Sequence, residues 1–253
     1  MIRFLLSLFI LLQCAVAGPS QQMWLAQKTA AAAGIAVNGA AKNSALSANA
    51  SVSITPASGE MLVAIACEYG ASVNNGTVSD NLSSAGWTKV TSDVETSAGG
   101  IGIAIWYLAN ASPSITTVTF TRSTGTSYNT LIVHRVSGVS TSTPFTSGEA
   151  ATAKSSGATS LATGGVSNAT ANSIYFAGVV NGSGNNPCTM TINSTGTTGT
   201  WSLYNATNSQ ELNAFDNMPL SVPNLIVSST ASRGHGWAFE SSLRCTAAIA
   251  VFH

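Results

Sequence analysis

The sequence predicts an all-β protein, an antiparallel two-sheet sandwich built from two pseudo-repeated halves. Apolar residues alternate with hydroxyl residues at a period of two over much of the chain, which is typical of half-buried strands. Turn-forming pairs such as Asn75-Gly76 and Asn181-Gly182 separate these runs. One arrangement of apolar runs and tryptophans occurs twice along the chain, which predicts the two halves.

The strands expected in the first half follow in order. Residues 61–69 are almost continuously apolar, as in a strand that is covered on both faces. In residues 101–108, three isoleucines and Tyr107 alternate with Gly102, Ala104, Trp106 and Leu108. In residues 117–121, threonines alternate with valine and phenylalanine. Such a threonine ladder could face ice or a matrix, although one threonine strand is ordinary β chemistry. Residues 131–136, which include His134, predict a further buried strand.

The second half repeats the first. Residues 61–64 precede Trp87 by nearly the same interval as residues 174–177 precede Trp201, and the offset between the copies is 113 to 116 residues. Each half alone offers a marginal number of strands for an independent core. We therefore expect one sandwich domain over residues 18–253, with pseudo-repeats at about 44–140 and 160–253. Two small sandwiches in tandem are the alternative.

The N-terminus has the form of an export signal. Arg3 precedes the apolar residues 4–12, and Ala15-Val16-Ala17 supply the small residues at which a signal peptidase cuts. We expect a signal peptide over residues 1–17 and a mature chain that is secreted, extracellular or periplasmic, without membrane contact after cleavage. A lipoprotein acylated at Cys14 is the alternative.

Low charge limits the partners. Charged residues are 7% of the chain and the formal net charge is zero. No basic stripe is present, which excludes nucleic acid as an expected partner. Weak charge leaves little repulsion between copies, so self-association is expected. Cys67, Cys188 and Cys245 remain after leader cleavage and permit one disulfide in any of three pairings.

Trp106, His235 and Trp237 are the candidate ligand-binding residues. Trp106 lies opposite the isoleucine face of its strand, on the same face as Gly102 and Ala104, and these small neighbours would leave its ring accessible to a sugar. His235 and Trp237 lie in a glycine-flanked segment and would point to one side of an extended chain. Burial in a core is the alternative for each of the three.

The acids do not form a recognisable catalytic group. Asp93 and Glu95 would share one face of a strand, whereas Glu240 stands alone, and a glycosidase needs carboxylates that converge across a cleft. Asp80 and Asn81 could offer oxygens to calcium, but no series of ligands follows. We predict no catalytic residues, no metal site and no cofactor, and the sequence leans towards a non-enzymatic protein.

Residues 56–64 (PASGEMLVA), 86–90 (GWTKV) and 105–109 (IWYLA) resemble a group of secreted bacterial and phage-associated jelly-roll domains without an assigned activity. The likeness covers most of the mature chain and consists of core-packing patterns. It implies a jelly-roll or lectin-like sandwich in an extracellular setting.

These features predict a secreted, non-enzymatic protein that binds carbohydrate and adheres, or that is structural at a surface, with a glycan or cell-surface polymer as partner. A polysaccharide hydrolase or lyase on a lectin-like fold is one alternative. A phage-associated or virion-associated structural protein is the other.

Overall fold

The structure, a computed structural model, describes residues 34–70, 73–97, 100–182, 190–203, 212–214 and 218–253. Gly34–His253 form one compact unit. The expected signal peptide, Cys14 and Cys188 lie outside the described residues. In the described part of the chain, no helix has the length and apolar character needed to cross a membrane.

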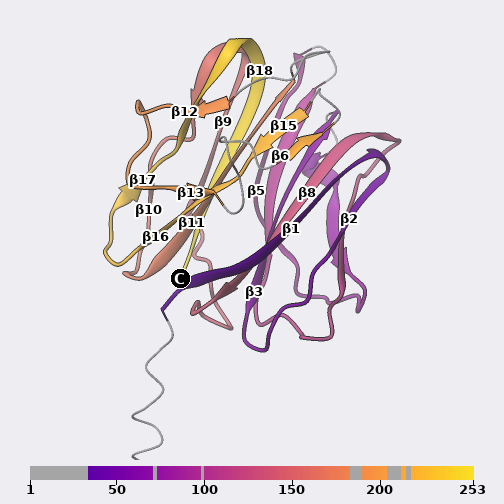
Figure 1. Cartoon of the computed structure of the whole chain (residues 1–253), viewed down its shortest axis with the longest axis vertical. Coiled ribbons are helices and arrows are strands. Elements are labelled where there is room, and N and C mark those ends of the chain that lie inside the picture. Colours follow the sequence, from indigo (N-terminus) through magenta and orange to yellow (C-terminus); the bar gives the residue numbers. More distant parts are fainter. Residues whose placement is uncertain (1–33, 71–72, 98–99, 183–189, 204–211, 215–217) are drawn as a thin grey trace, which may run out of the picture. The chain divides into compact units, whose positions relative to one another are not determined.

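The first half of the unit has the strand order of a jelly roll (Figure 1). Five strands form a large sheet in the order β1-β8-β3-β6-β5, and three form a smaller sheet in the order β2-β7-β4. In a jelly roll, eight strands form two facing sheets. Here β5 pairs with β6, so the two sheets contain five and three strands. The elements are β1 (Ala36–Ser47), β2 (Asn49–Ser53), β3 (Met61–Tyr69), the 3₁₀ turn η1 (Val73–Asn75), β4 (Thr77–Asp80), β5 (Thr88–Glu95), β6 (Ile101–Leu108), β7 (Thr117–Thr121) and β8 (Ser127–Ser137).

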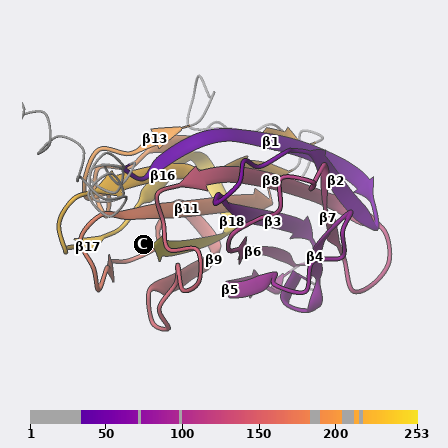
Figure 2. The same ribbon diagram turned by 90° about the horizontal axis from the view of Figure 1, so that it is seen from below.

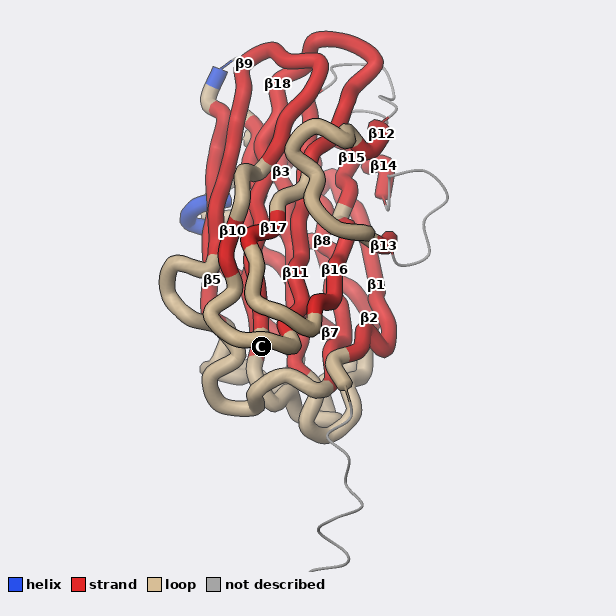
Figure 3. Tube along the Cα trace, turned by 90° about the vertical axis from the view of Figure 1, so that its left-hand side faces the viewer, coloured by secondary structure: helices blue, strands red, loops and turns tan. Residues whose placement is uncertain are grey.

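The second half repeats part of this order, since β9-β18-β11 and β10-β17 correspond to β1-β8-β3 and β2-β7. In its large sheet β9 pairs with β18, β18 with β11, and β11 with β15 and β16, while β10 and β17 form a separate pair (Figure 3). The prediction of an all-β fold with antiparallel sheets and two similar halves is confirmed. The boundaries of the domain and of its repeats stay predictions. The strands are β9 (Ala150–Ala162), β10 (Val166–Ser167), β11 (Ser173–Gly182), β12 (Met190–Ile192), β13 (Ser202–Leu203), β14 (Leu212–Ala214), β15 (Met218–Ser221), β16 (Pro223–Val227), β17 (Ser232–Arg233) and β18 (Gly236–Phe252).

Strand β3 shows how the apolar runs hold the layers together. Nearly every residue of β3 is buried, as its continuous apolar sequence predicts. Because successive side chains of a strand point to opposite faces, Val63 and Ile65 face the second half, whereas Leu62 and Ala64 face the sheet β2-β7-β4. One strand therefore contributes to two cores.

We call the apolar residues between the two large sheets the contact layer. They come from β3, β6 and β8 on one side and from β11 and β18 on the other, and include Met61, Val63, Ile65, Ile103, Ile105, Ile132, Ile174, Phe176, Ala248, Ala250 and Phe252. Strand β5 contacts β9 at one margin of this layer, and β14 contacts β1 at the other. These strands occupy equivalent places in the two halves, so the halves pack like the subunits of a two-fold symmetric dimer.

Three edge strands of the large sheets carry features that prevent pairing with other chains. Lys42 lies on β1, Lys89 on β5 and Lys154 on β9. The pairing register shifts between Val37 and Gly39 in β1, next to Lys89 in β5, and between β9 and β18. Lysines and bulges are two established ways to protect an exposed strand edge. These edges are therefore guarded against edge-to-edge association.

We expect replacement of Lys42 and Lys89 by threonine to accelerate aggregation several-fold. Both lysines are exposed, and threonine suits a strand, so the free energy of unfolding should change by no more than about 0.5 kcal/mol. Light scattering over time measures the effect. The double arginine variant, which keeps both charges, is the control, and a threonine variant that stays as clear as this control would show that the lysines do not guard the edges.

Candidate functional site

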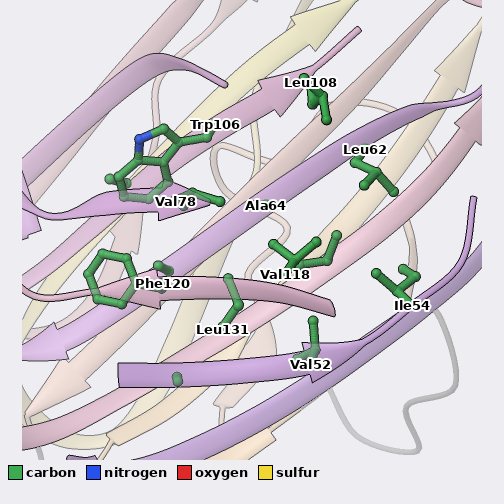
Figure 4. Close-up of a cluster of buried hydrophobic side chains, with 14 of the residues drawn as sticks. Val52, Ile54, Leu62, Ala64, Val78, Trp106, Leu108, Val118, Phe120 and Leu131 are labelled. Atoms are coloured by element: carbon green, nitrogen blue, oxygen red, sulfur yellow. The ribbon is translucent and has the colours of Figure 1, made fainter. Parts of the chain in front are cut away.

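Trp106 lies inside the core of the first half, between the sheets β1-β8-β3-β6-β5 and β2-β7-β4 (Figure 4). It is 3% exposed, and its ring centroid lies 5.7 Å from that of Phe120 on β7. The small neighbours make room for packing: a Cβ on Gly102 would collide with Val73. The accessible ring that these neighbours suggested is not found, because the smaller sheet covers this face.

His235 and Trp237 lie together in the core of the second half, apart from Trp106. The ring centroid of His235 is 4.5 Å from Trp237 and 4.9 Å from Trp201. The Trp237 Nε1–H donates to Ser221 Oγ at 3.1 Å. Burial lowers the pKa of His235 to about 4, so its ring is neutral near pH 7. None of the three predicted residues presents a ring to an external ligand.

The two acids of β5 have different structural roles. Asp93 links the two halves, and Glu95 stabilises the turn that follows the strand. The Lys154 ammonium on β9 donates to Asp93 Oδ1 at 2.9 Å, and the Ser97 hydroxyl donates to Glu95 Oε2 at 2.6 Å. Burial raises the pKa of each carboxyl, but the hydrogen bonds outweigh it and both pKa values are lowered. A general acid needs a raised pKa. This pair therefore gives no support to a hydrolase or lyase.

Asp80 and Asn81 organise the loop that follows β4. Asp80 Oδ1 accepts from the N–H of Leu82 at 2.8 Å, and Oδ2 accepts from Nε1 of Trp87 at 2.9 Å. Asn81 Oδ1 accepts from the N–H of Thr116 at 2.8 Å. These oxygens serve local turns, and among the described residues no group of three potential metal ligands is found.

Other acidic side chains also contact basic groups within the unit. Two of them form ion pairs that join neighbouring strands and loops, Glu60 with Arg135 at 2.8 Å and Glu68 with Arg122 at 3.3 Å. A carboxylate oxygen of Glu149 lies 3.4 Å from Nδ1 of His253. Glu60 receives both Nε and Nη2 of Arg135, the geometry that makes such pairs strong. Several of the few charged side chains of this chain are thus paired with one another within the unit.

Asn168 is a buried polar residue that the sequence did not single out. Its Oδ1 accepts from the N–H of Ala231 at 2.7 Å and from the hydroxyl of Tyr175 at 3.0 Å. Its Nδ2 donates to the carbonyl of Ser229 at 3.2 Å. The amide thereby joins β11 to the loops next to β10 and β17. In a chain rich in asparagine, no sequence signal distinguishes this one.

The outer face of β2-β7-β4 is a regular array of small polar side chains, which we call the hydroxyl grid. Its eight members are Asn49, Ser51 and Ser53 of β2, Thr117, Thr119 and Thr121 of β7, and Thr77 and Ser79 of β4. Strand pairing aligns them in rows, with Asn49 opposite Thr121 and Thr77 opposite the same threonine. Figure 2 shows the three strands beside one another. None of the eight residues is charged or aromatic.

The sequence also drew attention to two other tryptophans and to the cysteines. Those among the described residues pack in or against the cores. Trp87 packs against the first-half core and Trp201 lies within the second-half core. Cys67 lies in the contact layer and Cys245 in the second-half core, so these two do not form a disulfide with each other.

Comparisons with known proteins do not assign the chain to a family. No protein-family model and no curated protein matches it. One solved structure, the crystal structure of the STIV MCP, a viral major capsid protein, aligns with 85% of this chain and 97% of its own, at 6% identity and a TM-score of 0.26. A likeness of this size identifies neither a fold nor a function.

Proposed function

We propose that the chain is a non-catalytic structural protein of a surface layer or virion-like particle, whose copies associate through uncharged faces. The distribution of charge supports this proposal. Asp93, Glu60 and Glu68 are held in ion pairs inside the unit, while the outer face of β2-β7-β4 presents uncharged groups.

Uncharged faces suit close association. Burying an unpaired charge costs far more than burying a hydroxyl that finds a hydrogen-bond partner. The net charge, which is formally zero for the whole chain, also keeps long-range repulsion between copies small. The guarded edges of the large sheets direct contact towards faces, which favours closed or layered assemblies over fibrils.

Secretion and a glycan or cell-surface partner remain part of the proposal as expectations from the sequence. Sugar binding by stacking on Trp106, His235 or Trp237 would require these buried rings to become exposed. The assembly role requires no such change, and it is therefore the function that the geometry supports best.

Light scattering coupled to size-exclusion chromatography tests the proposal. We expect the average mass of the purified chain to rise above that of the monomer as its concentration increases, and electron micrographs to show particles or layers of regular size. The threonine variant of Lys42 and Lys89 is a useful control, because its edge-driven aggregates should be irregular. Monomer at every concentration would overturn the assembly role.

A further inference from the structure

Eight segments of the chain have the form Asn-x-Ser/Thr, the acceptor triplet for asparagine-linked oligosaccharides. In the transfer reaction the amide nitrogen Nδ2 forms a bond to the first sugar and loses one hydrogen, and the lipid pyrophosphate that carried the oligosaccharide leaves. The attached glycan is bulky and hydrated, so an acceptor asparagine has to lie at the surface of the folded protein. The triplets begin at Asn49, Asn75, Asn81, Asn110, Asn168, Asn181, Asn193 and Asn205, of which Asn205 lies outside the described residues.

The two halves differ in where these asparagines lie. In the first half all four are exposed: Asn49, Asn75, Asn81 and Asn110. They lie at or beyond the ends of strands or in a turn, where a glycan would extend into solvent. In the second half Asn193 is half-buried, whereas Asn168 and Asn181 are buried. The triplets at these two buried positions are the ones that the fold does not accommodate as glycan carriers.

Asn168 uses the atom to which a sugar would be joined. Its side chain is buried, and Nδ2 donates to the carbonyl of Thr170 at 2.5 Å, to the carbonyl of Ser229 at 3.2 Å and to Oγ of Ser173 at 3.3 Å. These acceptors surround the nitrogen. A sugar on Nδ2 would take their place and would force the loop between β16 and β17 away from β11.

Asn181 lies in the middle of the large sheet of the second half. It is fully buried on β11, directly opposite Cys245 of β18, and β15 pairs with β11 on the other side. Val179, two residues earlier, belongs to the second-half core, so the side chain of Asn181 points into the same core. A glycan at this position could not be enclosed there, and the second half could not close around it.

We infer that the chain folds along a route on which no oligosaccharide is transferred to asparagine. Transfer takes place while a chain enters the secretory pathway and is still unfolded, so burial in the folded protein would not protect Asn168 or Asn181. Glycans at these positions would then prevent the second half from folding. Export across a bacterial membrane, rather than through the endoplasmic reticulum, meets this condition for a chain with a leader. The inference concerns the folding route and does not depend on assembly.

Secretion from yeast, which glycosylates asparagines, tests the inference. Thr170→Val combined with Ser183→Ala destroys the triplets of Asn168 and Asn181 and leaves both asparagines in place; we call this double variant the buried-site variant. The side chain of Thr170 is exposed, and Ser183 lies outside the described residues. We expect yeast to secrete several-fold more folded protein from the buried-site variant than from the parent chain, because glycans block the folding of the parent.

The matched control makes the same two kinds of substitution at exposed sites. Thr77→Val combined with Ser112→Ala destroys the triplets of Asn75 and Asn110, and this variant should be secreted as poorly as the parent. When made in a bacterial periplasm without oligosaccharide transfer, the parent and both double variants should have the same midpoint of urea unfolding. A buried-site variant that yeast secretes no better than the parent would overturn the inference, as would an equal gain for the control.

Discussion

Lowering the pH from 7 to 4.5 should reduce the free energy of unfolding by about 5 kcal/mol. His134 is fully buried in the contact layer, with its ring centroid 4.9 Å from that of Phe176, and burial lowers its pKa to about 3. Burial also lowers the pKa of His235 to about 4. The folded chain keeps both rings neutral, whereas the unfolded chain binds protons below about pH 6.5. Stability therefore falls as the pH decreases through 6.5, by about 1.4 kcal/mol per pH unit for each histidine.

Protonation of the carboxylates also reduces stability, but only at a lower pH than protonation of the histidines. The contributions of the two kinds of group can therefore be measured separately. For Glu60 and Asp80, hydrogen bonds outweigh the opposing effect of burial and lower the pKa. Their stabilisation is present above the pKa of the unfolded chain and is lost only below about pH 4.5. Urea unfolding followed by tryptophan fluorescence between pH 7 and 4.5 therefore reports the histidines. His134→Leu should remove about half of the dependence, and an unchanged dependence in this variant would show that His134 does not contribute.

Replacement of Asn168 by alanine should cost about 4 kcal/mol of stability, because it leaves several buried donors and acceptors without their partner. The affected groups include the hydroxyl of Tyr175 and the N–H of Ala231. Urea unfolding at pH 7 measures the loss. Asn49→Ala, at an exposed position of β2, is the control and should change stability by less than about 0.5 kcal/mol. A loss below about 1 kcal/mol for Asn168→Ala would contradict a structural role for this amide.

The fold class could be predicted because it depends on local patterns. Period-two alternation and turn pairs are present in each segment, and the continuous apolar run of β3 reports burial on both faces. The two halves were visible in the sequence for the same reason, since the apolar runs of β3 and β11 and the tryptophans that follow them recur at an offset of 113 to 116 residues.

The site could not be predicted, because it depends on which layers cover which faces. Small residues beside Trp106 are equally compatible with an exposed ring and with close packing under a second sheet. That sheet forms only when β2 pairs with β7, which follows it after four intervening strands. The same pairing assembles the hydroxyl grid from three short segments, of which only the threonine ladder of β7 was evident in the sequence. The role of Asn168 likewise depends on loops that are distant along the chain.

The average mass of the protein as a function of salt concentration tests most directly whether copies associate through uncharged faces. If they do, particles larger than the monomer should persist with the same mass from low salt to about 1 M sodium chloride, where interactions between exposed charges are screened. Dissociation into monomers as the salt concentration rises would show that charged groups hold the copies together and would contradict the account.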